Sequence, residues 1–192
     1  LSMNVLSSSD RIMIGNMVGT SEVGIYNLAY SISLIMTMFN NALLQTIEPW
    51  IYRKLKENKA ADIAQVAYPC FFLIAGLNIL LIMFAPEAIA IFFFFSYQEA
   101  IWTVPSVALS VFFMFLYTFF ATFEFYYEKT QYIAGATVGG ALLNIGLNYI
   151  CIQKFGYIAA GYTTLFSYML FALLHYYFMR KICKEYLNDL RP

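Results

Sequence analysis

The chain has 192 residues, of which 61% are hydrophobic, 19% aromatic and 11% charged, and its eleven Lys and Arg balance eleven Asp and Glu. Soluble domains carry about 25% charged residues, and a soluble fold of this length has too large a wetted surface to hide so many apolar side chains. The composition therefore excludes an ordinary soluble domain, a disordered chain and a nucleic-acid binder with a basic face, and it predicts a polytopic membrane protein of about one domain.

Six segments are predicted to be transmembrane helices, because a bilayer core of about 30 Å requires about 20 mainly apolar residues per helix. The first of them is the least apolar. In chain order the predicted spans are 1–18, 23–47, 63–85, 102–123, 131–152 and 158–179. The expected fold class is all-α, a polytopic bundle of about six spans that forms a single lobe over residues 1–192.

Prolines are expected to mark the helix ends of this bundle. Pro86 is predicted to end the third span, and a separate short helix at the membrane surface is predicted over 88–95. Pro105 is predicted to lie in the first turn of the fourth span.

Basic residues divide unequally between the connections of the predicted bundle. Nine Lys and Arg residues fall on one side, in 53–59, 124–130 and 180–192, and only Lys154 falls on the other side. Cytoplasmic connections are enriched in Lys and Arg. We therefore predict a multi-pass protein with both ends of this segment in the cytoplasm.

Asp10 and Arg11 are charged residues inside the first predicted span, where charge is costly and indicates function by default. Neighbouring residues of a helix point about 100° apart, so each is expected to face a polar cavity or another helix rather than its neighbour. The functional interpretation is an anion contact at Arg11 and a protonatable or cation-linked carboxylate at Asp10. The structural alternative is a buried charge pair that fixes helix packing, or an arginine that extends to the membrane surface.

Polar amides form two further candidate sites. Asn144 and Asn148 are four residues apart on one face of the fifth span, where they would line a hydrophilic cavity or, as the favoured interpretation, hydrogen-bond to another helix. Asn41 and Gln45 form a similar patch in the second span. Glu124 is another secondary candidate near the inner end of the fourth span, where a solvated helix end is the favoured explanation.

The sequence shows no set of residues that would carry out catalysis. His175 is the only histidine, and it is expected to be an interface residue rather than a proton relay. One histidine and three separated cysteines predict no metal site and no disulfide framework. Since the sequence also lacks a glycine-rich phosphate loop and a nucleophile with a base, we expect neither an enzyme nor a bound cofactor.

Five segments of the chain are familiar in their order and spacing. They are SDRIMIG (9–15), EVGIYNLAYS (22–31), PWIYR (49–53), NIGLNY (144–149) and FGYIAAGYTT (155–164). Together they resemble the Wzx-type polysaccharide flippases of the multidrug/oligosaccharidyl-lipid/polysaccharide exporter superfamily, over residues 7–182 approximately.

The resemblance implies two six-helix lobes around a central cavity, with this chain similar to the C-terminal lobe. The chain, which begins with Leu1, is then expected to be a fragment whose N-terminal lobe is its partner. The implied function is to move polyprenyl-pyrophosphate-linked oligosaccharide across the bacterial inner membrane by alternating access, for O-antigen, capsule or exopolysaccharide synthesis. Membrane lipid and a glycan polymerase are further implied partners.

By the same resemblance, Arg11 would contact the anionic headgroup or an acidic sugar, and Asn144 and Asn148 would contact sugars. Asp10 would couple movement to a proton or sodium gradient, or hold the neighbours of Arg11 in place.

Two alternatives stay open: a drug or small-molecule exporter of the same superfamily, and a membrane protein without a transport function. An acyltransferase or polymerase would need catalytic residues in the outer connections, where 86–101 offers only Glu87 and Glu99.

Overall fold

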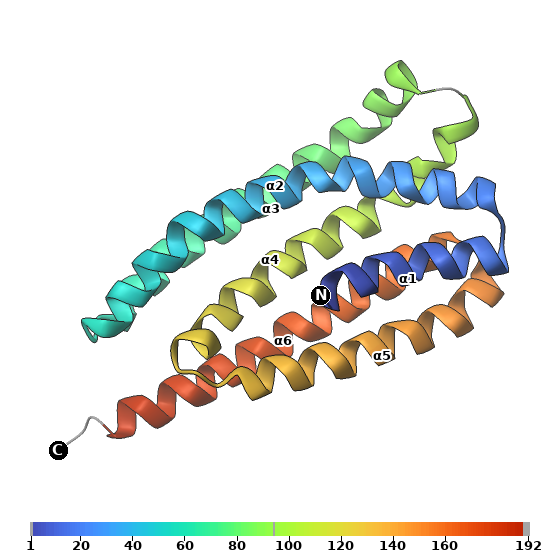
Figure 1. Ribbon diagram of the computed structural model, residues 1–192. Coiled ribbons are helices and arrows are strands. Elements are labelled where there is room, and N and C mark those ends of the chain that lie inside the picture. Colours follow the sequence, from blue (N-terminus) through green and yellow to red (C-terminus); the bar gives the residue numbers. More distant parts are fainter. Residues whose placement is uncertain (1, 94, 190–192) are drawn as a thin grey trace.

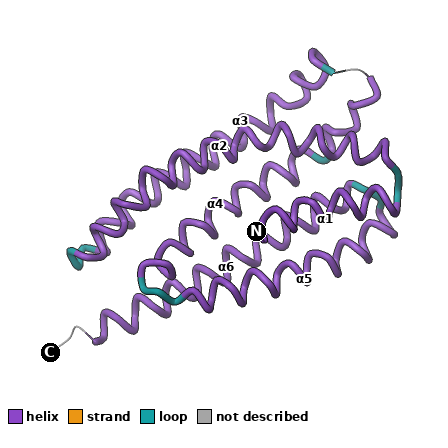
Figure 2. Tube along the Cα trace, in the orientation of Figure 1, coloured by secondary structure: helices purple, strands orange, loops and turns teal. Residues whose placement is uncertain are grey.

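The computed structural model describes residues 2–93 and 95–189, and it describes side chains over 8–93 and 97–184. All regular elements of the described residues are helices, with no strand among them (Figure 2). They are α1 (Ser2–Met17), α2 (Thr20–Lys56), α3 (Ala60–Phe92), the 3-10 helix η1 (Phe95–Trp102), α4 (Val104–Tyr126), α5 (Thr130–Phe155) and α6 (Ile158–Asp189). The predicted fold class, an all-α polytopic membrane bundle, is confirmed.

Each predicted span falls on one of the six α-helices (Figure 1). Within the described residues, four helical segments are long and apolar enough to cross a bilayer. They are α3, Tyr97–Tyr126, α5 and Ile158–Lys184. The helix α1 has only 16 residues, and α2 is long but carries many polar side chains. That α1 and α2 also cross the membrane stays a prediction.

Successive helices run in opposite directions, so that the connections gather at two ends of the bundle (Figure 1). One end carries the α2–α3 turn, the α4–α5 turn and the C-terminal part of α6, and therefore nearly all basic residues of the connections. These are Arg53, Lys54, Lys56, Lys59, Lys129, Arg180, Lys181 and Lys184; Arg191 lies outside the described residues. We call this the basic end. Lys154 lies near the other end, together with Glu22, Glu87 and Glu99.

The two turns at the basic end have the same backbone geometry. Asn58 and Glu128 have φ angles of 57° and 58°. In each turn the next residue donates its N–H to a carbonyl five residues earlier, Lys59 to Lys54 at 2.9 Å and Lys129 to Glu124 at 2.8 Å. This is the Schellman arrangement, which satisfies carbonyls at a helix C-terminus and reverses the chain sharply.

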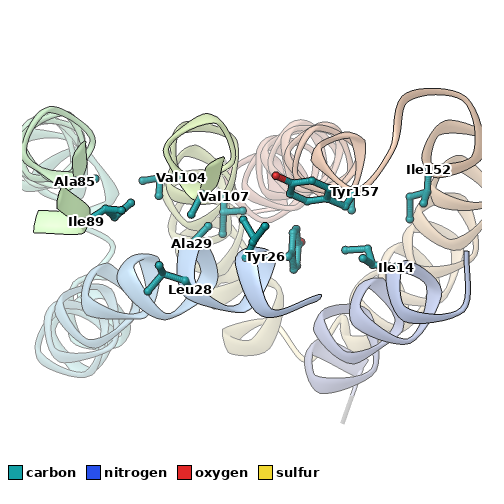
Figure 3. Packing of buried hydrophobic residues seen from close by; sticks show 13 residues of the cluster. Ile14, Tyr26, Leu28, Ala29, Ala85, Ile89, Val104, Val107, Ile152 and Tyr157 are labelled. Carbon is teal, nitrogen blue, oxygen red and sulfur yellow. The ribbon is translucent and has the colours of Figure 1, made fainter. Parts of the chain in front are cut away.

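Buried apolar side chains tie all six α-helices together near the end opposite the basic end. Figure 3 shows Tyr26 and Tyr157 between Val104 and Val107 of α4 on one side and Ile14 and Ile152 on the other. A second core cluster, toward the basic end, is built mainly from α2, α3 and α4. The helices therefore converge near one end and associate in smaller groups near the other.

The prolines behave differently from one another. Pro105 lies in the first turn of α4, as predicted. Pro86 does not end the third helix: α3 continues through it to Phe92, so the separate helix predicted over 88–95 is wrong, although Phe94 itself lies outside the described residues. A proline within a membrane helix removes one hydrogen bond, which the remaining long apolar helix tolerates.

Candidate functional site

Asp10 lies at the meeting point of four helices. Its side chain is 1% exposed and accepts three hydrogen bonds, each from a different helix. The donors are Tyr26 Oη of α2 at 3.0 Å, Asn148 Nδ2 of α5 at 2.6 Å and Thr164 Oγ1 of α6 at 2.8 Å. Three donors replace the water that a buried carboxylate loses, so the charge is compensated without a basic partner.

The hydrogen bonds continue between α5 and α6. Asn148 donates to Asn144 Oδ1 at 3.2 Å and accepts from the Thr163 hydroxyl, and Asn144 Nδ2 donates to Thr164 Oγ1 and Ser167 Oγ, both at 3.3 Å. We call these residues the Asp10 cluster: Asp10, Tyr26, Asn144, Asn148, Thr163, Thr164 and Ser167. Since both asparagines are 0% exposed, the structure shows the favoured interpretation, hydrogen bonding between helices.

Small residues bring α5 close enough to α6 for these contacts. The buried positions of α5 recur every fourth residue, at Gly140, Asn144, Asn148 and Ile152. At Gly140 the Phe171 ring of α6 occupies the space in which a Cβ atom would lie. The face that Asn144 and Asn148 were predicted to share is therefore the face by which α5 packs, and Gly140 allows the close approach.

Arg11 points away from Asp10, as the helical spacing predicts, and the described residues show no ion pair between the two. Its guanidinium lies over the Tyr30 ring, with Cζ 4.6 Å from the ring centroid. The Nε atom is buried and has no hydrogen-bond partner within the described part of the chain. Arg11 thus keeps a positive charge that no carboxylate of the described residues neutralises by an ion pair.

A cavity of about 330 Å³ lies between α1, α2, α4 and α6, next to this cluster. Asp10, Tyr30 and Thr164 form part of its wall, and hydroxyl and amide groups of α2 and α4 continue it. Those groups belong to Thr37, Asn40, Asn41, Ser110 and Thr118. Leucine, valine, methionine and phenylalanine side chains complete the wall. A cavity of this size and mixed polarity is suited to part of a polar ligand.

The secondary candidates lie in three different places. Asn41 lines the cavity, whereas Gln45 is exposed one turn further along α2 and is not part of its wall. Glu124 lies far from both. It is 0% exposed, and its Oε1 is 2.6 Å from Nδ1 of His175, which is 1% exposed.

The expectation of a solvated helix end at Glu124 is therefore wrong, and His175 is buried rather than placed at the membrane surface. The physical reason is the packing of α4 against α6, in which His175, a residue inside the predicted span 158–179, contacts Glu124 directly.

Sequence reasoning missed the hydroxyl groups that complete the Asp10 cluster. Thr163 and Ser167 lie one turn apart within an apolar helix, which is a readable signal for a polar stripe. Tyr26 offers no comparable signal, because aromatic residues are abundant throughout the chain. Within the part of the chain that the structure describes, no three His, Cys, Asp or Glu side chains come together to hold a metal ion.

Comparisons with known proteins add an independent observation. Residues 1–55, which include Asp10, Arg11, Tyr26 and Tyr30, match the family model of polysaccharide biosynthesis proteins. Over 174 residues the chain is 24% identical to a probable low-salt glycan biosynthesis flippase, Agl15, of Haloferax volcanii. That alignment covers 88% of this chain, which spans only 37% of the relative's length.

No solved structure matches the chain. In its sequence, the chain is similar to flippase-type proteins of polysaccharide biosynthesis.

Proposed function

We propose that the chain is one six-helix lobe of a two-lobe flippase for lipid-linked oligosaccharides. The observation that carries the proposal is a cavity of mixed polarity that Asp10 and Tyr30 line, with Arg11 next to it, stacked on the Tyr30 ring. Sugar hydroxyls and a pyrophosphate cross hydrocarbon only if protein groups replace their water partners. The hydroxyl and amide groups of the cavity wall supply such partners, while the polyprenyl tail remains in lipid.

Arg11 is the residue that we assign to the anionic part of the substrate. Its guanidinium is stacked on Tyr30 and is not paired with Asp10, so its charge and its N–H groups are available for a phosphate or an acidic sugar. Asp10, by contrast, is saturated with donors, and we assign it the role of holding α1 against α5 and α6.

Asn144 and Asn148 are fully buried in this conformation. We therefore assign them first to the positioning of Asp10. In the proposal they contact sugars only when α5 and α6 separate during the transport cycle.

The second lobe is part of the proposal. The chain spans 37% of its flippase relative, which leaves room there for a partner lobe of similar size. Two lobes that rock about a site between them provide alternating access, as in other transporters built from repeats. Asn41 and other cavity residues of α2 and α4 would line the path of the glycan.

The membrane and pathway are assigned from the charge distribution and the resemblance. The basic end is placed in the cytoplasm, because connections rich in Lys and Arg remain on that side. The proposed location is the bacterial inner membrane, and the proposed product is O-antigen, capsule or exopolysaccharide, polymerised by a partner enzyme after transfer.

Complementation of a flippase-deficient strain by the full-length two-lobe transporter tests this function. We expect R11A to lower glycan export about tenfold or more, since a charge-assisted contact to the substrate is lost. R11K is expected to recover part of the export, and K154A is the matched control because Lys154 is a basic residue remote from the cavity. Normal export by R11A would exclude the assigned role of Arg11, and failure of the unsubstituted transporter to export glycan would exclude the function.

A further inference from the structure

Glu124 and His175 form a buried titratable pair that the proposed substrate site does not use. Glu124 lies two residues before the end of α4, and His175 lies in α6. Nδ1 and Oε1 are 2.6 Å apart, with the two side chains 1% and 0% exposed. The other carboxylate oxygen, Oε2, is also buried and has no hydrogen-bond partner among the described residues.

Aromatic rings enclose the pair. The Tyr117 ring of α4 is 5.4 Å from the His175 ring, measured between centroids, and the Phe178 ring is 6.4 Å from it. Phe178 in turn stacks on Tyr132 of α5 at 4.7 Å. The imidazole therefore lies in apolar surroundings, where an uncompensated charge is costly.

Several charged groups on the elements around the pair are engaged with other residues. Lys181 lies over the Tyr132 ring, Arg180 contacts Tyr176, and Lys54 of α2 pairs with Asp62 of α3. The described charged and titratable groups on these elements include Tyr117 and Tyr126 on α4, Tyr132 on α5, Tyr176, Tyr177, Arg180, Lys181, Cys183 and Lys184 on α6, Tyr52 and Lys54 on α2, and Asp62 on α3. Among the described residues, no ion pair other than the one with His175 involves Glu124.

The contact itself requires one proton between Nδ1 and Oε1. With one proton the pair carries a net charge of −1, and with a second proton it is neutral, either as imidazolium and carboxylate or as two uncharged groups. A closed, apolar interface favours the neutral form, whereas an interface opened to water allows the charged form. Closing the interface would thus take one proton from water, and opening it would return that proton.

The helices that hold the pair also form the cavity. Thr118 of α4 and Tyr168 of α6 belong to the cavity wall. Tyr168 stacks on Tyr117 at 6.1 Å, and Tyr117 contacts His175. A movement that widens the cavity between α4 and α6 therefore also acts on the Glu124–His175 contact.

We propose that Glu124 and His175 form a proton-binding site, separate from the Asp10 cluster, that couples proton uptake and release to the closing and opening of the α4–α6 interface. Its role in transport rests on the proposed function. The binding of the proton is a property of this chain alone, and it is measured separately.

Nitrogen-15 NMR of the chain in lipid nanodiscs tests the site directly. His175 is the only histidine, so a chain labelled at histidine and purified with a tag that lacks histidine gives one pair of ring nitrogen signals. In E124Q we expect the midpoint of imidazole protonation to fall by about one to two pH units relative to the unsubstituted chain, because the nearby negative charge is lost.

E128Q makes the same substitution at an exposed glutamate and is expected to leave the midpoint unchanged. E124D keeps the charge and is expected to keep the midpoint within about half a pH unit. An E124Q midpoint equal to that of the unsubstituted chain overturns the proposal. If E124Q fails to fold, an E124D midpoint more than about one pH unit away from that of the unsubstituted chain overturns it instead.

Transport by the full-length protein in proteoliposomes tests the coupling. We expect E124Q and H175Q to lose the stimulation of glycan transport by a proton gradient, a loss of about fivefold or more, while transport without a gradient persists. Unaltered stimulation in both variants would overturn the coupling. If the unsubstituted protein moves no glycan, the proposed function fails, and the NMR result still decides whether the pair binds a proton.

Discussion

Two carboxylates are buried among the side chains that the structure describes, and their surroundings differ in kind. Asp10 accepts three hydrogen bonds from three helices, all from neutral amides and hydroxyls. Glu124 contacts a single partner, which is itself titratable, and one of its oxygens has no partner in the described structure. The first carboxylate is fixed by groups that keep their protonation at physiological pH. The second lies beside a histidine, a residue type that serves as donor or acceptor, and one of its own oxygens accepts no hydrogen bond from the described residues.

The two sites therefore differ in how easily their hydrogen bonds can rearrange. A saturated network is costly to rearrange, because every displaced donor must find another acceptor. A pair with one contact and one oxygen without a partner has fewer hydrogen bonds to lose when its surroundings change. The structure thus suggests a rigid site near the middle of α1 and a responsive one where α4 ends, and four substitutions test this contrast.

The largest effect is expected for D10N. The NH2 group of the new asparagine replaces one carboxylate oxygen, so its hydrogens point at donors that this oxygen accepted from. Asn148 cannot turn its own oxygen toward them, because that oxygen already accepts from Thr163. At least one donor is left without an acceptor, which lowers the free energy of unfolding by about 2 to 4 kcal/mol. Denaturation in mixed micelles measures this change. D62N, which removes the ion pair with Lys54 at the surface, serves as a control and is expected to cost much less, because solvent screens an exposed pair. Equal losses of unfolding free energy in D10N and D62N would show that the buried hydrogen bonds of Asp10 contribute no more than a surface ion pair.

The next effect tests the close packing on which the Asp10 cluster depends. G140A places a methyl group where the Phe171 ring lies, and overpacking of this kind costs about 1 to 3 kcal/mol. The neighbouring Gly139 has no atom within 4 Å of the position that a Cβ would take. G139A is therefore expected to be neutral or slightly stabilising in the same unfolding measurement. An unchanged free energy of unfolding in G140A would show that the packing of α5 against α6 does not require a glycine at this position.

A smaller effect is expected for N148A. Asn148 links three helices, whereas Asn78, also fully buried, donates only to the Ile74 carbonyl of its own helix at 3.0 Å. N148A should lower the free energy of unfolding by about 1 to 2 kcal/mol and N78A by less than about 0.5 kcal/mol. The difference between N148A and N78A measures how much hydrogen bonds between helices add to the free energy of unfolding. A loss in N78A as large as that in N148A would contradict the network.

The smallest effect on stability is expected for E124Q. Both the oxygen and the nitrogen of a glutamine can meet His175 Nδ1, since the neutral imidazole can present a donor or an acceptor there. The expected loss at pH 8 is about 1 kcal/mol or less. A loss that exceeds that of D10N would reverse the comparison between the two sites.

Periodicity and composition were sufficient for the architecture. The apolar segments predicted the all-α membrane bundle, and the spacing of Asn144 and Asn148 predicted that they share a face. The separation of Asp10 from Arg11 also follows from helix geometry alone. These inferences succeed because they depend on residues close together in the sequence.

The errors concern partners that are distant in sequence. No residue close to Glu124 in the sequence indicates that His175, which lies 51 residues later, is its partner. The donors of Asp10 on α5 and α6 are equally remote, and Pro86 stays helical because of the long apolar helix around it. Such features depend on tertiary packing, and one sequence does not show it.

The separation of the Asp10 partners has a consequence for synthesis. Tyr26 follows Asp10 by 16 residues, but Asn148 and Thr164 follow it by 138 and 154. At about 5 to 20 residues per second, Thr164 is made roughly 8 to 30 seconds after Asp10. For most of that interval Tyr26 is the only one of the three donors that has been made, so the carboxylate of Asp10 must keep water or other donors until α5 and α6 are in place.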